Sequence, residues 1–368
     1  MKRLQIKEIL KFIFPIFLLM IVSFLIMYNA KFILDGYKYY LMKQIIYYIL
    51  GYIIMFLVIK FNYKYIYDNI FIFYIIMNII LLLLLFFGKS VNGAKAWINL
   101  GFISIQPSEF MKIILLIYLS KVFYLNKSND FKLILKTCII VLIPSLLTFL
   151  EPDTGTVLFY IIMWVFMLIY YDFNKWWYIA GVLVILLLGS CFGYLYFFNQ
   201  DLFIKIFGTS FFYRMDRLVN FMNSTGYQIN NALIGIGNGG MFGLGIDKFH
   251  IYFPEAVTDF AFALVLTDLG FITGLFVIIL FIYLDILLLK NLDIVNYDKK
   301  YFIIGFLGIF LYQQLEHIMM NLGLLPITGI TLPFISYGGS SLISYFICFG
   351  IILNFKLKKF LYELVKKS

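Results

Sequence analysis

The chain has few charged residues and few of the side chains that build disulfides or metal sites. Only 13% of its 368 residues are charged, against about a quarter in a typical soluble domain. Its three cysteines all lie inside apolar runs, and its two histidines are far apart. The sequence therefore predicts no disulfide framework and no metal-ligand cluster, and a soluble globular fold is excluded.

Apolar and aromatic residues are abundant instead. They make up 63% and 21% of the chain, the mean hydropathy is +0.97, and the apolar runs reach the ~20 residues that span a bilayer. We therefore predict an all-α, polytopic membrane protein in which residues 1–368 form a single integral membrane domain. The ten predicted transmembrane helices cover about 10–29, 42–60, 68–87, 107–125, 131–150, 155–171, 176–198, 258–289, 301–322 and 335–355.

The basic residues predict the orientation. Apart from Lys112 and Lys136, which fall inside spans, 18 Lys and Arg fall on the side of the termini and nine on the other side, so the positive-inside rule places both termini in the cytoplasm. A large extracytoplasmic loop, 199–257, then lies between the seventh and eighth helices. The eighth span is too long for a ~30 Å hydrocarbon core unless part of it projects. The net charge of +10 is explained by topology, so we expect no nucleic acid partner.

Two of the outer segments combine proline with carboxylates. In residues 106–112 (QPSEFMK), Glu109 and Lys112 are three apart on one helical face. They form either a buried structural ion pair, or a pair in which Glu109 orients Lys112 towards an anionic ligand or Asp259. Trp97, just upstream, is an interfacial anchor or a ligand contact. In residues 151–156 (EPDTGT), Asp153 caps the following helix or helps to bind a cation or a sugar.

The 199–257 loop holds most of the remaining polar chemistry. Only three arginines occur beside 26 lysines, and two of them, Arg214 and Arg217, are three residues apart here. Their planar, forked donors suit phosphate recognition. Lys248 follows a glycine-rich run, 235–245, which either approaches a ligand closely or is flexible. Asp259, at the membrane boundary, is either a first-turn helix residue or a general base.

A fourth segment, residues 325–341, has two helix-breaking prolines followed by Gly-Gly-Ser-Ser. Such small residues allow helices to pack closely in lipid, and a groove for a lipid chain is the alternative.

Taken in order, these four blocks resemble the SEDS family of shape, elongation, division and sporulation proteins. The resemblance implies a peptidoglycan glycosyltransferase of the bacterial inner (cytoplasmic) membrane that polymerises lipid II at the outer face and releases undecaprenyl pyrophosphate. It also implies a class B penicillin-binding protein transpeptidase as partner, beside membrane lipid. The family's essential acid lies in a Thr-Asp-Phe motif, here Thr258, Asp259 and Phe260. Thr267 and Asp268 depart from the two glutamates usual further along.

The implied reaction assigns roles to these residues. Asp259 is the predicted catalytic base, and Arg214, Arg217, Lys112 and Lys248 stabilise the leaving pyrophosphate, with Mg²⁺ or Mn²⁺ as a candidate cofactor. Glu109, Trp97 and Asp153 complete the predicted substrate-binding set. Two rival classes remain open at this point: a lipid II flippase or other polytopic transporter, and a noncatalytic scaffold.

Overall fold

The computed structural model describes most of the chain, and the statements below concern those residues. They are 2–31, 39–91, 94–99, 101, 104–126, 130–209, 211–212, 215, 226–246, 254–293, 295 and 297–367.

Helices form nearly all of the described structure. Eight of them are long and apolar enough to cross a membrane, so the chain is a multi-pass membrane protein. The helices are α1 (Lys2–Ala30), α2 (Tyr40–Lys60), α3 (Tyr63–Asp68), α4 (Ile70–Phe87), α5 (Pro107–Leu125), α6 (Asp130–Leu150), α7 (Thr154–Tyr170), α8 (Lys175–Phe198), α9 (Gln200–Phe207), α11 (Tyr227–Gly239), α12 (Ala261–Leu292), α13 (Tyr297–Asn321) and α14 (Gly339–Lys367).

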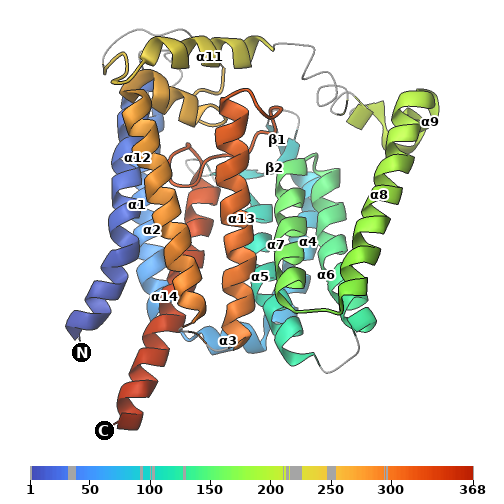
Figure 1. The fold of residues 1–368 in the computed structure, drawn as a ribbon, viewed down its shortest axis with the longest axis vertical. Helices are drawn as coiled ribbons and strands as arrows, with labels where there is room; N and C mark the ends of the chain where they lie inside the picture. Colours follow the sequence, from blue (N-terminus) through green and yellow to red (C-terminus); the bar gives the residue numbers. More distant parts are fainter. Residues whose placement is uncertain are drawn as a thin grey trace.

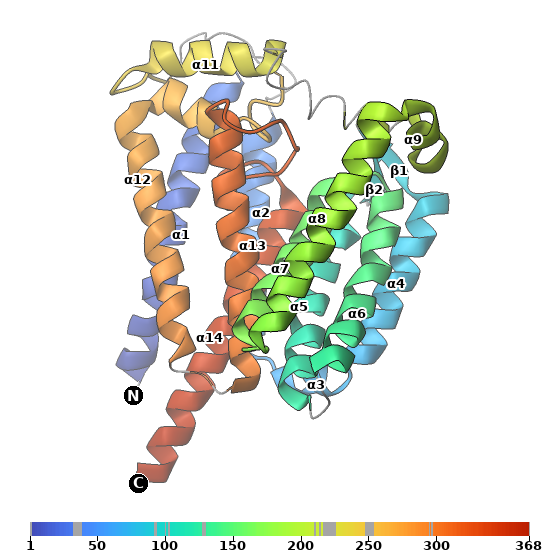
Figure 2. The ribbon, with the colours of Figure 1, turned by 45° about the vertical axis from the view of Figure 1, so that its right-hand side comes forward.

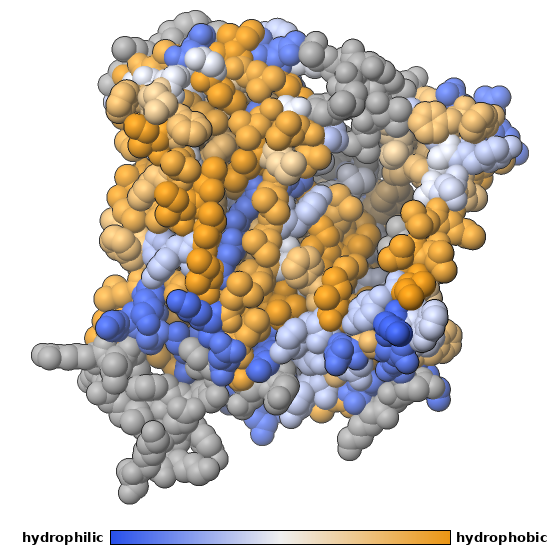
Figure 3. Space-filling model, in the orientation of Figure 1, coloured by the Kyte–Doolittle hydropathy of each residue, from blue (hydrophilic) through white to orange (hydrophobic). Residues whose placement is uncertain are grey.

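The long helices form one bundle with two chemically distinct ends. The beginning of α1 and the end of α14 lie together at one end, whereas α11 and the strands lie at the other (Figure 1). On the face drawn in Figure 3, hydrophobic residues cover the middle of the molecule, and hydrophilic residues gather at the end that holds the termini. This distribution is what a bilayer requires of a spanning bundle.

Two predicted spans, 107–125 and 155–171, correspond to helices outside those eight. Helix α7 is apolar but has only 17 residues. Helix α5 is largely buried and packs against α4, α7 and α13, so it forms the centre of the bundle. Helix α8 is different, because it stands at the periphery (Figure 2) and, among the side chains that the structure describes, its most apolar stretch has none that is buried.

The prediction of an all-α fold misses a small sheet at the end of the bundle away from the termini (Figure 1). Strands β1 (Lys89–Val91), β2 (Ala94–Asn99) and β3 (Ser104–Ile105) pair antiparallel in the order β1-β2-β3. In this register Ile98 lies opposite Ile105. The short strands connect α4 to α5 and bring the chain to Pro107, the first residue of α5.

The excess length predicted for the eighth span has a structural reason, because α12 is broken at Gly270. This residue has φ 82° and ψ 173°, which no helix contains. A Cβ placed on Gly274 would lie 3.6 Å from the Phe262 ring, although twelve residues of straight helix would separate the two by ~18 Å. The short first part of α12 therefore folds back against the long second part. The fold-back accounts for the excess length of the span, and projection of part of it beyond the bilayer stays a prediction.

Candidate active site

The segment after α13, residues 322–338, folds back along α13 and forms the centre of the site. His317 Nδ1 donates to the carbonyl of Ile330 over 2.7 Å, and Gln313 Nε2 donates to the carbonyl of Thr331 over 2.5 Å. The Thr328 hydroxyl donates to the Glu316 carboxylate. The segment contains two prolines and has no regular secondary structure of its own. Side chains of α13 therefore provide hydrogen-bond partners for its polar groups.

Asp259 lies in the turn Pro254–Phe260 that leads into α12. Its N–H donates to the carbonyl of Glu255 over 3.0 Å, and its own carbonyl accepts from Asn321 Nδ2 over 2.9 Å. The neighbouring carbonyl of Thr258 accepts from Ser336 Oγ over 2.7 Å. The backbone of the turn is therefore held by both α13 and the 322–338 segment. Because Phe260 is the N-cap of α12, Asp259 precedes the helix, and the first-turn alternative is wrong.

The Asp259 carboxyl is electrostatically suited to accept a proton near neutral pH. Burial raises its pKa to about 7, with a further contribution from the negative charge of Glu255, against the opposing effect of the Thr258 hydroxyl. A general base is most effective when its pKa lies near the working pH. A Cβ on Gly329 would lie 3.9 Å from Asp259 Oδ2, so the 322–338 segment forms one wall beside this carboxylate.

Asp153 caps α7, as one of the two sequence interpretations predicted. Its carboxylate accepts from Thr156 N–H over 3.1 Å and from the Thr156 hydroxyl over 2.5 Å. It also accepts from Gln106 Nε2 over 2.7 Å and from Ser108 Oγ over 3.2 Å. Burial raises the pKa of Asp153, and the charge of Glu109 acts in the same direction, while these hydrogen bonds oppose them. Asp153 thereby ties the start of α5 to the start of α7.

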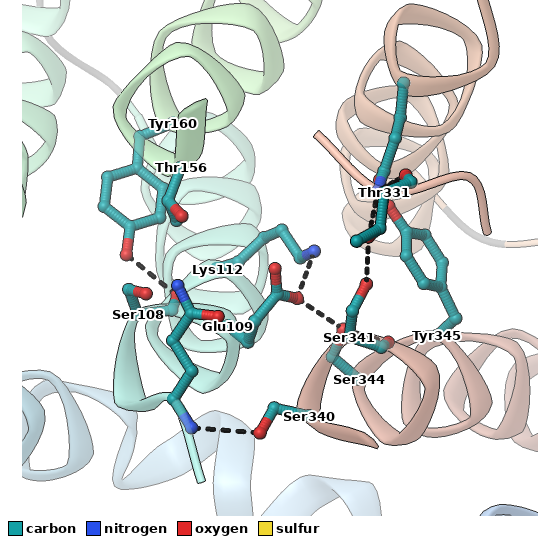
Figure 4. A network of polar contacts seen from close by, with 12 residues as sticks. Ser108, Glu109, Lys112, Thr156, Tyr160, Thr331, Ser340, Ser341, Ser344 and Tyr345 are labelled. Carbon is teal, nitrogen blue, oxygen red and sulfur yellow. Dashed lines mark hydrogen bonds and ion pairs between the residues drawn. The ribbon is translucent and has the colours of Figure 1, made fainter. Parts of the chain in front are cut away.

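Glu109 and Lys112 form a buried ion pair inside the bundle (Figure 4). The 2.7 Å pair is flanked by Ser344, whose hydroxyl donates to Glu109 over 2.9 Å. The ammonium group lies 4.7 Å from the ring centre of Tyr345 and 5.1 Å from that of Phe159. With 1% of its side chain exposed, Lys112 faces protein groups. This arrangement matches the first of the two sequence interpretations, a buried structural ion pair. A ligand-binding role for Lys112 remains a prediction.

The glycine-rich run packs onto the break in α12. The N–H groups of Leu244 and Gly245 donate to the carbonyls of Thr267 and Asp268 over 2.9 and 3.0 Å, and Phe271 N–H donates to the carbonyl of Gly240 over 3.0 Å. A Cβ on Gly243 would collide with the backbone of Asp268. The glycines therefore allow two backbones to meet, and they supply the hydrogen bonds that the broken helix lacks. The sequence offered ligand approach or flexibility, and the structure favours neither.

The other predicted site residues are placed less fully. Trp97 lies in β2, a strand that contacts α5, and is partly buried. Arg214, Arg217 and Lys248 lie outside the described residues. Within the described ranges, no group of three or more His, Cys, Asp or Glu could hold a metal ion, and the divalent cation stays a prediction.

Two carboxylates were not assigned to the site from the sequence. Glu316, on α13, reaches Thr328, and a polar residue deep in a span was its only sequence signal. Glu151 precedes Pro152, is fully buried, and has no hydrogen-bond partner for either oxygen among the described residues. Burial raises the pKa of Glu151 to about 8, and the charge of Asp153 adds to the effect.

Comparison with known proteins identifies the family. The model of the FtsW/RodA/SpoVE family, described as cell cycle protein, matches residues 5–360. The probable peptidoglycan glycosyltransferase FtsW of Wigglesworthia glossinidia brevipalpis is 31% identical over 350 residues, covering 87% of this chain and 84% of the relative. The peptidoglycan glycosyltransferase MrdB of Helicobacter pylori is 31% identical over 365 residues, covering 94% and 89%.

Solved structures share the fold. A chain of a peptidoglycan synthase complex, described as coordinating polymerization and crosslinking, has a TM-score of 0.79 at 22% identity and covers 95% of this chain and 97% of that one. The rod shape determining protein RodA of Thermus thermophilus has a TM-score of 0.68 at 22% identity, with 95% and 96% covered. The order of the sequence motifs, the family match and the shared fold agree: the chain belongs to the FtsW/RodA/SpoVE family, also called the SEDS family.

Proposed function

We propose that this chain is a peptidoglycan glycosyltransferase that polymerises lipid II into β-1,4 glycan at the outer face of the bacterial inner membrane. The relatives named peptidoglycan glycosyltransferase support this activity over transport. The observation that carries the mechanism is Asp259, a carboxyl whose pKa is raised to about 7 and whose backbone is fixed from two sides.

The topology we propose has ten spans, with α5 and α7 added to the eight long apolar helices. Both termini are cytoplasmic, and residues 199–257 form an outer loop within a single membrane domain. This topology is supported by the 18-to-nine distribution of basic residues in the sequence and by the position of both chain ends at one end of the bundle (Figure 1). It places the turn of Asp259 at the outer leaflet, where lipid II is polymerised.

In the proposed reaction, a 4-hydroxyl of one lipid II attacks the anomeric carbon of an α-linked glycan pyrophosphate. The new C–O bond forms with inversion as the bond to the pyrophosphate oxygen breaks. Asp259 takes the hydroxyl proton, and undecaprenyl pyrophosphate leaves as an anion. Arg214, Arg217 and Lys248 are the proposed donors that stabilise its negative charge, with a divalent cation as a further candidate.

The remaining predicted residues support this centre. Asp153 ties the start of α5 to the start of α7, the Glu109–Lys112 pair is bonded to Ser344 of α14, and Trp97 lies in β2, a strand that contacts α5. The proposed partner is a class B penicillin-binding protein transpeptidase, which would crosslink the strands.

The test is polymerisation of lipid II by the purified full-length chain, alone and with a cognate transpeptidase. Asp259→Asn is expected to lower the rate ~10²–10⁴-fold, the usual contribution of a general base. Asp298→Asn is the matched control, because Asp298 lies in the first turn of α13 at the opposite end of the bundle. A transporter would make no glycan. Polymerisation by Asp259→Asn at the wild-type rate would refute the assignment of the base.

A further inference from the structure

Two adjacent residues of the 322–338 segment lie beside two different carboxylates. Thr328 donates its hydroxyl to Glu316 on α13. The next residue, Gly329, has φ +77°, and a Cβ there would lie 3.9 Å from Asp259 Oδ2. One short piece of backbone therefore connects Glu316 to the proposed catalytic base. The left-handed conformation of Gly329 lets this backbone pass close to the Asp259 carboxylate.

Burying the Glu316 carboxylate is energetically unfavourable, and packing alone gives no reason for an acidic residue at this position. The residue is 3% exposed, and its second carboxylate oxygen, Oε2, has no hydrogen-bond partner among the described residues. Its charge also interacts with that of Asp259. A buried carboxylate inside a membrane helix, facing a second carboxylate, is unfavourable and marks a functional position.

The groups that face this pair are few within the described residues. Glu255 lies on the same turn as Asp259 and repels it. Tyr312 on α13 is near Glu316. His317 points its Nδ1 to the carbonyl of Ile330. The predicted cations of the 199–257 loop lie outside the described residues.

We propose that Glu316 is a positioning residue for Asp259, acting through the Thr328 hydroxyl and the Gly329 backbone. This inference rests on the proposed function and names a second acid that the reaction depends on. Glu316 acts in two separable ways. The hydrogen bond to Thr328 fixes the wall beside the Asp259 carboxylate. The negative charges of Glu316 and Asp259 also repel each other, which disfavours the state in which both carboxyl groups are ionised.

Substitutions separate the bond from the charge. Thr328→Val removes the bond and leaves the charge, whereas Thr328→Ser keeps both. Glu316→Gln removes the charge but keeps an oxygen that can accept the Thr328 hydroxyl. Asp298→Asn, in the first turn of the same helix, is the control for a lost carboxylate about 27 Å away along α13.

Polymerisation of lipid II is followed as kcat, KM and the pH dependence of kcat/KM for each purified full-length variant. Thr328→Val is expected to lower kcat ~10–100-fold with little change in KM, the range expected for a misplaced catalytic group. Thr328→Ser should keep kcat within ~3-fold of wild type, because the hydroxyl is retained. Glu316→Gln should move the acidic limb of the profile to lower pH, and Asp298→Asn should leave it in place.

A purely structural role would change the yield of folded protein and not the position of the acidic limb. A Glu316→Gln profile that coincides with the wild-type profile would overturn the charge coupling. Wild-type kcat in Thr328→Val would overturn the positioning. Failure of the proposed function gives a different result. Wild type would then make no glycan, or Asp259→Asn would be fully active, and in either case the proposed function and this inference would both be wrong.

Discussion

The pKa of Asp259 predicts how polymerisation depends on pH. An ordinary aspartate has a pKa of about 3.9 and is fully ionised at both pH 6 and pH 8. Burial and the charge of Glu255 raise the pKa of Asp259 to about 7. A base with that pKa is ~9% ionised at pH 6 and ~91% ionised at pH 8. We therefore expect kcat/KM for lipid II to fall about tenfold between pH 8 and pH 6.

A substitution at Glu255 tests the cause of the shift. Glu255→Gln removes the neighbouring negative charge and leaves burial unchanged, so the acidic limb should move to lower pH without reaching the value of a free aspartate. The amide oxygen can still accept the Thr258 hydroxyl, which donates to Glu255 Oε2 over 2.7 Å. The turn should therefore keep its shape, and kcat at pH 8 should change little.

The assay is the initial rate of glycan formation from labelled lipid II between pH 5 and pH 9, at substrate concentrations that give kcat/KM. Glycan length on gels confirms that the same reaction is followed throughout. A profile that is flat from pH 6 to pH 8 would refute the reasoning, because the base would then have an ordinary pKa. An unmoved limb in Glu255→Gln would show that the charge of Glu255 does not contribute to the shift.

Three further changes test the packing around the site. Glu151→Gln should raise the thermal stability in detergent at pH 7 to 8 but not at pH 4. The pKa of Glu151 is about 8 in the folded protein against 4.5 when unfolded, so the unfolded state loses the proton first as pH rises. The free energy of unfolding of wild type therefore falls between these two pH values, by at most about 3 kcal/mol at pH 7. Lys112→Met should destabilise the protein by ~3–5 kcal/mol by leaving Glu109 unpaired, and adding Glu109→Gln should restore part of the loss. Gly270→Ala should lower the yield of folded protein far more than Gly101→Ala, since both have positive φ but only Gly270 meets other backbone atoms. Similar yields would show that backbone strain alone decides the outcome.

Much of the fold followed from the apolar runs, because a bilayer imposes the same length on every spanning helix. The break at Gly270 did not follow, since residues 261–292 are apolar on both sides of it and read as one long helix. The fold-back depends on hydrogen bonds from Leu244 and Gly245, which lie more than twenty residues upstream. A hydropathy pattern reflects neighbouring residues only, so it cannot predict a hydrogen-bond partner that distant in the sequence.

The site was predictable where a motif has a local cause. Asp153 stands directly before α7 and three residues before Thr156, the spacing of an N-cap, and the structure has that cap. The environment of Asp259 was less accessible, because its pKa depends on Glu255 and on burial by segments from other helices. A carboxylate deep in a span marked Glu316 in the sequence, but nothing in the sequence named Thr328, which lies twelve residues further along the chain, as its partner.

The 322–338 segment lies between the Asp153 cap and the Asp259 turn and packs beside both. Ile330 packs against α7 at Gly155, where a Cβ would lie 3.2 Å from the Ile330 side chain. Gly329, one residue earlier, lies against the Asp259 carboxylate. The Asp153 cap and the Asp259 turn are therefore linked by two consecutive residues. A shift of α7 can reach the base through this backbone. Loss of the Asp153 cap should therefore impair the same proton-transfer step as loss of Asp259, with a smaller effect on KM than on kcat.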